Sequence, residues 1–251
     1  MKITFVGVGG AFASSDYWQS NAYLWNENNS KIFLIDCGGD ARHGLAELGV
    51  NHKNIEAVYI SHLHTDHCGG LEWLGFCTYF DPNCGRPKLF IMRELIAPLW
   101  ETLKAGMQSL EGKVLELESF FDVVPLEKNE SFKWEDCKMT PFQTIHVMNG
   151  NIIVPSYGLM METKNQSTLF TSDTQFNPRM DFLYSKADLI FHDCETTPFK
   201  SRVHAHYDEL NSLPEETKNK MWLYHYAANP KQDFESNGFM GFVNKGQTFD
   251  I

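Results

Sequence analysis

Long apolar runs are missing from this sequence of 251 residues. No stretch approaches the roughly 18 to 20 consecutive apolar residues that a membrane-spanning helix needs. The opening MKITFVGVGG holds one lysine and a short apolar run that breaks into glycines, so it lacks the apolar region and cleavage site of a signal peptide. We therefore expect a soluble cytoplasmic protein without a membrane partner.

Basic side chains are also scarce. The chain has 21 lysines and arginines against 32 aspartates and glutamates, which gives a formal net charge of −11. Proteins that hold nucleic acid through its phosphates normally present a basic face. The acidic balance therefore argues against nucleic acid as a partner and leaves room only for a local basic patch.

Paired cysteine motifs are absent as well. The six cysteines form no Cys-x-x-Cys pair, and no second pair stands near Cys77 and Cys84. Disulfide frameworks are typical of short secreted chains, and a four-cysteine zinc site needs two close pairs. We expect buried free thiols.

Apolar patterns of strands and helices alternate along the chain, and its length and composition predict one domain, residues 1–251. Polar clusters follow several of the expected strands, in loops of the kind that commonly carry catalytic groups. A short helix is expected behind Asp40, as its N-cap, up to Gly49. The other expected helices are 71–80 and 94–107, and the expected strands are 2–8, 22–25, 31–35, 55–60, 88–92, 138–146, 157–161, 167–172, 189–192 and 221–225.

One short stretch, SHLHTDHCGG at residues 61–70, follows the expected strand 55–60 directly. An extended backbone would place His62 and His64 on one side, and a turn would let Asp66 and His67 face the same cavity. Neutral imidazoles and carboxylates are the usual protein ligands of zinc apart from cysteine. Four such groups in this spacing favour a metal site over a solvated loop.

The pattern H-x-H-x-D-H resembles the signature of the metallo-β-lactamase fold, and further motifs of that family follow in its order. Asp36 matches an aspartate that supports the site. The resemblance implies an α/β fold, a four-layer αββα sandwich with two metal ions at one edge between the sheets. It assigns His62, His64 and His146 to one metal, Asp66, His67 and His225 to the other, and Asp173 as the bridge.

An aspartate at position 173 resembles the hydrolases with two fully equipped metal sites, whereas β-lactam-hydrolysing branches usually carry cysteine there. Two metal ions a few ångströms apart can activate water and stabilise both the attacking and the leaving oxygen at phosphorus. We expect two zinc ions per chain, with manganese as the alternative. Asp66 is included among the catalytic residues as well as the ligands.

A histidine and an acid in the last third resemble the proton-donating pair of transfer-RNA 3′-processing endonucleases and related phosphodiesterases. Asp193 fills the acid position, although that pattern has glutamate there. His204 fits the general acid, because a carboxylate that orients an imidazole makes it a good proton donor. His206, where the pattern has threonine, is kept as a substitute, and a structural polar loop is the alternative.

Only 26 residues, 147–172, separate His146 from Asp173, so the long transfer-RNA-gripping arm of the endonucleases does not fit. The chain is most similar to phosphodiesterases that open 3′,5′-cyclic nucleotides (cCMP, cUMP, cAMP, cGMP), including phage anti-Pycsar enzymes that destroy an antiviral signal. The alternative is an arm-less nuclease acting on RNA 3′ ends.

Relatives are commonly homodimers, and residues 76–80 or 238–251 are the expected contact regions. Tyr17 and Trp18 would either stack on a base or lie on the surface.

Overall fold

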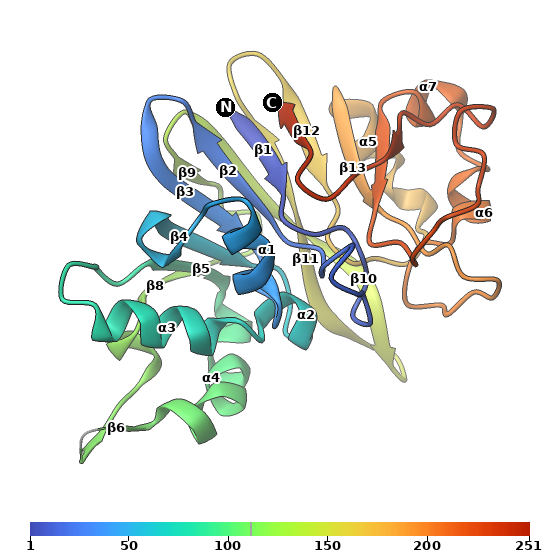
Figure 1. Cartoon of the computed structure of the whole chain (residues 1–251). Helices are drawn as coiled ribbons and strands as arrows, with labels where there is room; N and C mark the ends of the chain where they lie inside the picture. The colour runs from blue at the N-terminus through green and yellow to red at the C-terminus, as the bar shows by residue number, and fades with distance from the viewer. Residues whose placement is uncertain (111) are drawn as a thin grey trace.

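The computed structural model describes residues 1–110 and 112–251. Two large sheets form its centre (Figure 1). The first sheet contains β1 (Lys2–Phe5), β2 (Ala22–Asn26), β3 (Asn29–Ile35), β4 (Ile55–Ile60), β5 (Lys88–Met92), β8 (Asp122–Leu126) and β16 (Thr248–Asp250). The second contains β9 (Phe132–Trp134), β10 (Cys137–Asn149), β11 (Ile152–Glu162), β12 (Ser167–Phe170), β13 (Leu189–Asp193), β14 (Met221–Tyr224) and β15 (Gly241–Phe242).

The strand orders are β16-β1-β2-β3-β4-β5-β8 and β15-β14-β13-β12-β11-β10-β9. Both sheets are mixed: β3, β4, β5 and β8 run parallel in the first, and β12 to β15 run parallel in the second. A separate hairpin pairs β6 (Ser109–Leu110) with β7 (Lys113–Val114). The carboxyl ends of parallel strands gather at one edge of each sheet, which is where open α/β sheets usually bind ligands.

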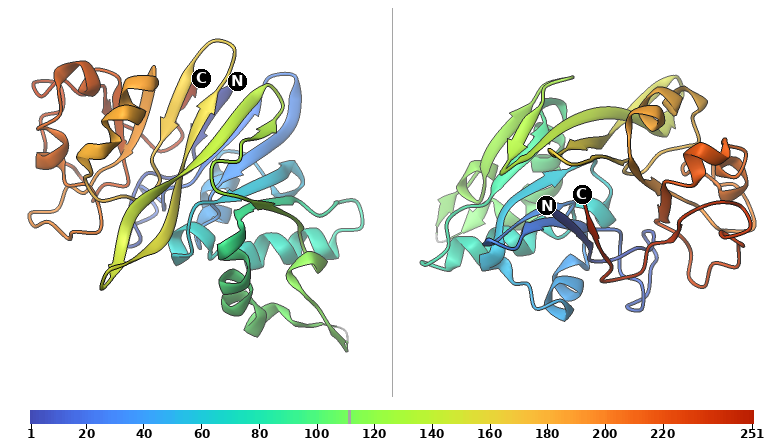
Figure 2. Two further views of the ribbon diagram at one scale, coloured as in Figure 1. Left: turned by 180° about the vertical axis from the view of Figure 1, so that it is seen from behind. Right: turned by 90° about the horizontal axis from the view of Figure 1, so that it is seen from above.

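Helices cover the outer sides of both sheets (Figures 1 and 2). Four belong to the first half of the chain: α1 (Ala41–Glu47), α2 (Thr65–Cys68), α3 (Leu71–Phe80) and α4 (Arg93–Met107). Three lie beside the second sheet: α5 (Asp181–Lys186), α6 (Tyr207–Leu210) and α7 (Glu215–Lys218). Short 3-10 turns are η1 (His52–Asn54), η2 (Leu117–Ser119) and η3 (Pro178–Met180). The result is the expected four-layer αββα sandwich.

Aromatic side chains fill the space between the two sheets. Phe5 of the first sheet is fully buried, and its ring centroid lies 4.9 Å from that of Phe191 and 5.6 Å from that of Tyr224 on the second sheet. Each buried side chain of this size contributes about 1.5–3 kcal/mol to the free energy of unfolding. A second apolar cluster, which includes Tyr184 and Leu210, lies under α5 and α6. Packing on both sides of the second sheet holds its strand ends in place.

Most expected elements are confirmed, but several details were wrong. The first strand ends at Phe5 and not at residue 8, because the backbone then turns to bond Asn21 and Tyr17. Asp40 stands at the N-cap position of α1, yet its carboxylate accepts the backbone N–H of Gln19 at 3.0 Å and makes no capping hydrogen bond. Strands β6, β7, β8, β9, β15 and β16 and the short helices α2, α5 and α7 were missed.

The C-terminal segment returns to the start of the chain. β16 pairs antiparallel with β1, and Ile251 N–H donates to the carbonyl of Met1 at 3.0 Å. The two termini therefore lie side by side in Figure 1. Within the described residues, no helix combines the length and the apolar character needed to cross a membrane.

Candidate metal centre

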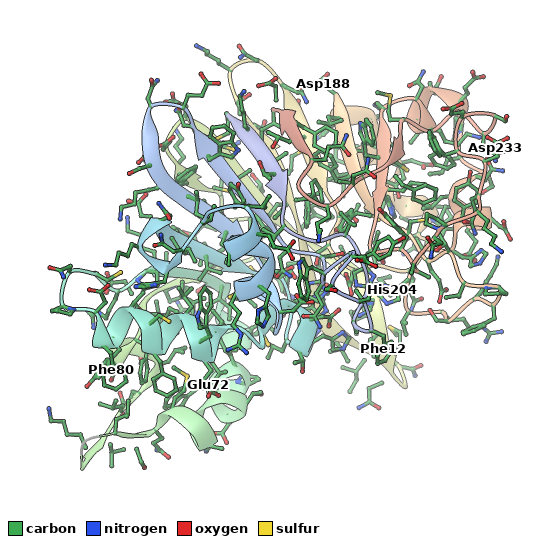
Figure 3. The ribbon with its side chains drawn as sticks, viewed as in Figure 1. Phe12, Glu72, Phe80, Asp188, His204 and Asp233 are labelled. Carbon is green, nitrogen blue, oxygen red and sulfur yellow. The ribbon has the colours of Figure 1, made fainter. Side chains whose placement is uncertain are left out.

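The candidate site collects side chains from the ends of five strands. Asp36 follows β3 and His62 follows β4, whereas Asp173, Asp193 and His225 stand at the ends of β12, β13 and β14. His204 lies at this end of the molecule, near the loop that carries Phe12 (Figure 3). The parallel arrangement of these strands brings residues from across the chain together.

Three of these segments change direction at a residue with left-handed backbone conformation. Asp36 has a φ of 61°, Ser172, which precedes Asp173, has 53°, and His225 has 65°. Non-glycine residues seldom adopt this conformation, which costs on the order of 1–3 kcal/mol and occurs often at functional sites. Each turn directly follows or nearly follows a strand, so the strained residues redirect the chain at the edge of the site.

The histidine-rich segment folds into the short helix α2. His64 stands at its N-cap position and is exposed, whereas His62, Asp66 and His67 are buried. Gly38 packs against this turn so closely that an added Cβ would lie 2.1 Å from the backbone oxygen of Asp66. Close backbone contact therefore fixes where Asp66 and His67 point.

His146 comes from a different kind of position, the middle of β10. The pairing of β10 with β11 shifts between Ile145 and Val147, which is a β-bulge at His146. Bulges re-aim a side chain and are frequent next to active sites. The Nδ1–H of His146 donates to the carbonyl of Val203 at 2.6 Å, and its Nε2 lies 3.1 Å from Nδ1 of His64.

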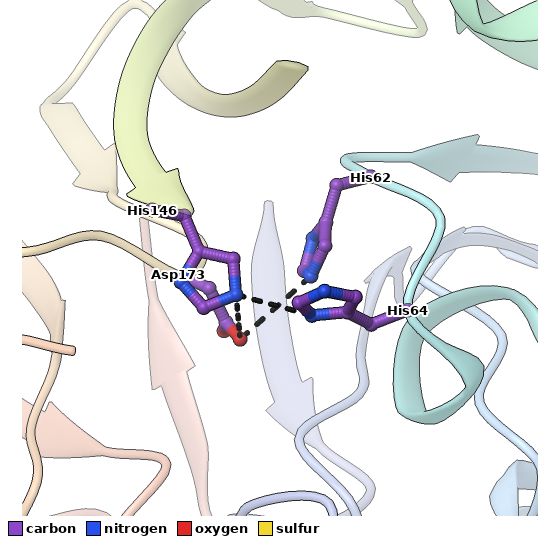
Figure 4. A group of neighbouring side chains, drawn as sticks. All are labelled: His62, His64, His146 and Asp173. Carbon is purple, nitrogen blue, oxygen red and sulfur yellow. Dashed lines mark hydrogen bonds and ion pairs between the residues drawn. The ribbon is translucent and has the colours of Figure 1, made fainter. Parts of the chain in front are cut away.

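The side chains form three overlapping clusters that share Asp173, and the third adds Asp193 and His204 to Asp173 and His225. The first contains His62, His64, His146 and Asp173 (Figure 4), and the second contains Asp66, His67, Asp173 and His225. In the first, Asp173 Oδ2 lies 3.8 Å from His62 Nε2 and 3.6 Å from His146 Nε2. In the second, His67 Nε2 and His225 Nε2 lie 3.3–3.5 Å from the Oδ2 atoms of Asp66 and Asp173.

These separations fit metal coordination. Two ligand atoms bound about 2.0–2.2 Å from a tetrahedral zinc ion lie roughly 3.3–3.6 Å from one another. Among the described residues, the Nε2 atoms of His62, His67 and His225 and the Oδ1 of Asp173 are buried and have no hydrogen-bond partner. Unpaired buried polar atoms are costly unless an ion or water satisfies them. The donor set and the spacing are consistent with a dinuclear metal site.

Asp36 and Ser61 set the orientation of two of these imidazoles. Asp36 Oδ2 accepts from His67 Nδ1 at 2.7 Å and from the Ser61 hydroxyl at 2.8 Å. Because the Ser61 hydroxyl donates its only proton to this carboxylate, the 3.1 Å contact with His62 Nδ1 requires the imidazole to donate. Both histidines therefore donate through Nδ1 and turn Nε2 toward the clusters, where a metal ion would take the place of a proton.

Charge at the centre favours a bound cation. Burial lowers the pKa of His67, but Asp173, Asp36 and Asp66 outweigh it and raise that pKa well above the usual value. Burial and the neighbouring charge of His67 lower the pKa of His62 well below its usual value. The field that holds a proton on His67 would equally attract a metal ion, whose binding displaces protons from its ligands.

His204 lies beside the second cluster and is held by Asp193. Its Nδ1–H donates to Asp193 Oδ2 at 2.9 Å, and its ring stacks on that of His225 at 4.6 Å. Burial lowers the pKa of His204, but the adjacent Asp193 carboxylate raises it to about 9. Thr174 N–H also donates to Asp193 Oδ2, which fixes the carboxylate.

His206 has a different environment, although it was kept as a substitute for His204. Its Nδ1 accepts the backbone N–H of Asp208 at 3.2 Å and its Nε2 donates to the carbonyl of Thr197 at 2.9 Å. The bond to Asp208 makes it the N-cap of α6, and it belongs to none of the three clusters.

Tyr17 and Trp18, which were expected either to stack on a base or to lie on the surface, have different positions in the structure. Tyr17 lines a cavity beside His204, whereas Trp18 stacks on His43 at 5.6 Å. Sequence reasoning gave no role to Ser61, although it directly precedes the motif, or to the bulge at His146, which has no signal in the residue pattern.

Comparison with known proteins agrees with this geometry. Residues 1–249 match the family model described as Anti-Pycsar protein Apyc1. An Anti-Pycsar protein Apyc1 of Paenibacillus harenae is 36% identical over 259 residues, with all of both chains covered. One of Bacillus phage vB_BsuM-Goe3 is 30% identical, covering 98% of this chain and 96% of the relative.

Solved structures show the same architecture. The metallo-β-lactamase fold protein YhfI from Bacillus subtilis superimposes with a TM-score of 0.78 at 16% identity, covering 99% of each chain. At this identity the likeness concerns the fold alone. The fold is thus the metallo-β-lactamase fold, and the chain belongs to the Anti-Pycsar protein Apyc1 family.

Proposed function

We propose that this protein is a phosphodiesterase that hydrolyses 3′,5′-cyclic nucleotides such as cCMP, cUMP, cAMP and cGMP to nucleoside monophosphates. The observation that carries the proposal is the 2.9 Å hydrogen bond from His204 to Asp193. This pair lies next to the first two clusters of possible metal ligands, which have Asp173 in common. A proton donor beside two metal sites suits cleavage of a bond whose leaving group is an alkoxide. The family description, Anti-Pycsar protein, supports destruction of a cyclic-nucleotide signal.

Seven residues would hold two zinc ions, with manganese as the alternative. His62, His64 and His146 would bind one and Asp66, His67 and His225 the other, with Asp173 shared. When bound, such ions lower the pKa of coordinated water toward about 7 and stabilise negative charge on the phosphoryl oxygens. Asp36 and Ser61 would orient one histidine at each metal site, His67 and His62.

His204 would supply the proton that the reaction needs. As the oxygen of water attacks phosphorus, the bond from phosphorus to a ribose oxygen breaks, and His204 gives its proton to that oxygen. Asp193 holds Nδ1 of His204, so Nε2 is the nitrogen that faces the substrate in this proposal. The neighbouring carboxylate raises the pKa of His204 and so favours the protonated form that a general acid requires.

A small substrate is supported by the segment between His146 and Asp173. It contains the end of β10, all of β11 and β12, and the turns between them. The β10–β11 pairing runs from Lys138–Glu162 to Asn149–Ile152, so the segment is a simple hairpin followed by one strand. It offers no separate arm to grip folded RNA, and the acidic net charge agrees.

A panel assay tests the proposal. Zinc-loaded protein is incubated with the four cyclic nucleotides and the products are separated by chromatography, with metal analysis of the same sample. We expect nucleoside monophosphates and about two metal ions per chain. Intact cyclic nucleotides after long incubation with the doubly loaded protein would refute the activity; a labelled precursor transfer RNA in parallel would reveal the alternative nuclease.

We further propose that the chain forms one domain, assembles as a homodimer and acts in the cytoplasm. Continuous packing between the sheets supports one domain spanning residues 1–251, and relatives from phages support action in the host cytoplasm. The family resemblance supports a homodimer. A single calorimetric unfolding transition and a dimeric mass in analytical ultracentrifugation are the expected results.

A further inference from the structure

A cavity of about 480 Å³ opens beside the metal centre. His204 and His225 line it, and its other walls come from residues 10–17, 195–203 and 226–228. Small-molecule sites typically have volumes of roughly 300–1,000 Å³. The cavity therefore has room for a ligand much larger than the phosphate that would lie at the metal centre.

Two exposed phenylalanines mark the rim of this cavity. Phe12 is 103% exposed and Phe199 is 68% exposed, and both line the cavity. Figure 3 shows Phe12 at the same end of the molecule as His204. Among the described residues, two other phenylalanines are exposed, Phe80 and Phe182, and neither lines it. Exposed rings at a concave site suit stacking on a flat ligand.

The deeper wall is also aromatic, but its rings are fixed. Tyr17 and Tyr226 meet edge to face with centroids 6.0 Å apart. The Tyr17 hydroxyl accepts the backbone N–H of Asn229 at 2.9 Å and donates to its side-chain oxygen at 3.3 Å. These contacts fix Tyr17 and Tyr226 in the lining of the cavity, whereas the ring of Phe12 is freely exposed.

Polar groups of the wall are largely engaged within the protein. Thr196 Oγ1 accepts the N–H of Ala227 at 3.0 Å, and Thr197 Oγ1 donates to the carbonyl of Phe199 at 2.6 Å. Glu195 Oε2 accepts the N–H of Ser201 at 2.8 Å. A ligand in this cavity would therefore be held more by ring faces than by hydrogen bonds to its edges.

We infer that this cavity binds the nucleoside part of the substrate, with the base stacked against Phe12 and Phe199. The inference rests on the proposed function. The ribose oxygen that leaves phosphorus receives its proton from His204, so the ribose and base must lie on the His204 side of the phosphate. His204 lines the cavity, so the cavity adjoins the group that would protonate the leaving ribose oxygen.

The test compares the double variant Phe12→Ala/Phe199→Ala with Phe182→Ala, which removes a 64% exposed ring on α5, away from the cavity. Stacking on an aromatic ring contributes a factor of roughly 5 to 150 in affinity per base. We expect the double variant to raise the KM for cyclic CMP and the Kd for cytidine 5′-monophosphate, measured by calorimetry, at least about fivefold. Binding of ribose 5-phosphate, which has no base, should stay unchanged in all three proteins.

Other outcomes separate this inference from the proposed function. An unchanged KM and Kd in the double variant, or an equal weakening of ribose 5-phosphate binding, would overturn the assignment of the cavity. So would a change confined to the oligomeric state, which would make the rim a contact between chains. If the wild type binds cytidine 5′-monophosphate through these rings but hydrolyses no cyclic nucleotide, the cavity assignment stands and the proposed activity falls.

Discussion

His204 and His206 show how much the hydrogen-bond environment decides at the scale of single residues. Both nitrogens of His206 bond to backbone groups, so the ring serves as a helix cap. His204 is bonded only through Nδ1 among the described residues, to a carboxylate that stabilises its charged form. A histidine with one nitrogen held and the other available is suited to proton transfer.

Ser61→Ala tests the orientation of His62. The variant removes the hydroxyl that links Asp36 to His62 Nδ1 but keeps the bond from the Ser61 backbone N–H to Asp36 Oδ1 at 2.8 Å. Because outer hydrogen bonds to metal-binding histidines typically contribute 10–100-fold in affinity, we expect a loss of that order at one of two metal sites. Chelator competition measures it.

A matched control for this variant is Thr78→Val, which removes a buried hydroxyl from α3, bonded to the carbonyl of Leu74. It should leave both metal affinities unchanged. Equal metal affinities in Ser61→Ala and the wild type would show that the hydroxyl does not position His62.

At the scale of elements, the sequence predicted the site better than its surroundings. The buried strands 55–60 and 88–92 and the helix 71–80 have the expected bounds, because long apolar patterns leave few alternatives. The seven expected metal ligands come together, since motifs at parallel strand ends meet at one edge.

Other features depend on contacts that a local pattern does not contain. β16 has only three residues and forms because β1 offers a free edge. The bulge at His146 exists only in the pairing of β10 with β11, and Trp18 is placed by stacking on His43. Such long-range choices override local propensity.

Gly38→Ala tests the packing of the β3 loop against α2. The added Cβ would lie 2.1 Å from the Asp66 backbone oxygen, so the backbone must shift and carry Asp66 and His67 with it. We expect a loss of about 1–3 kcal/mol in the free energy of unfolding and weaker binding of one metal ion. Denaturant titration and metal content measure the two effects.

Gly85→Ala is the control, because nothing lies within 4 Å of the Cβ that it would add. It should change the free energy of unfolding by less than about 1 kcal/mol. Full metal content in Gly38→Ala would contradict the proposed role of this contact.

At the scale of the whole molecule, the candidate metal site combines residues of the two sheets. His62, Asp66 and His67 belong to the first half of the chain, whereas His146 and Asp173 belong to the second. The carboxylates and the inward-facing imidazoles are buried between the layers. Bound ions would therefore cross-link the halves, and their removal would leave unpaired polar atoms at the interface.

Metal removal should therefore lower the Tm of the protein. An ion present at 100 times its Kd stabilises the folded state by about 2.7 kcal/mol, which corresponds to roughly 5–10 °C for a chain of this length. We expect a loss of at least this size after dialysis against a chelator, measured by scanning calorimetry, and recovery when zinc is restored. An identical Tm with and without zinc would contradict a shared metal centre.

The central claim is that a proton donor lies beside a dinuclear centre. Its most direct test measures the activity of the variant His204→Ala on two substrates. A cyclic nucleotide leaves through an alkoxide that needs the proton, whereas a nitrophenyl phosphodiester releases an anion that does not. We predict full metal content, a loss of about 10²–10⁴-fold in kcat for cyclic nucleotide and little loss for the nitrophenyl ester. Equal losses on both substrates, or a variant without metal, would contradict the role assigned to His204.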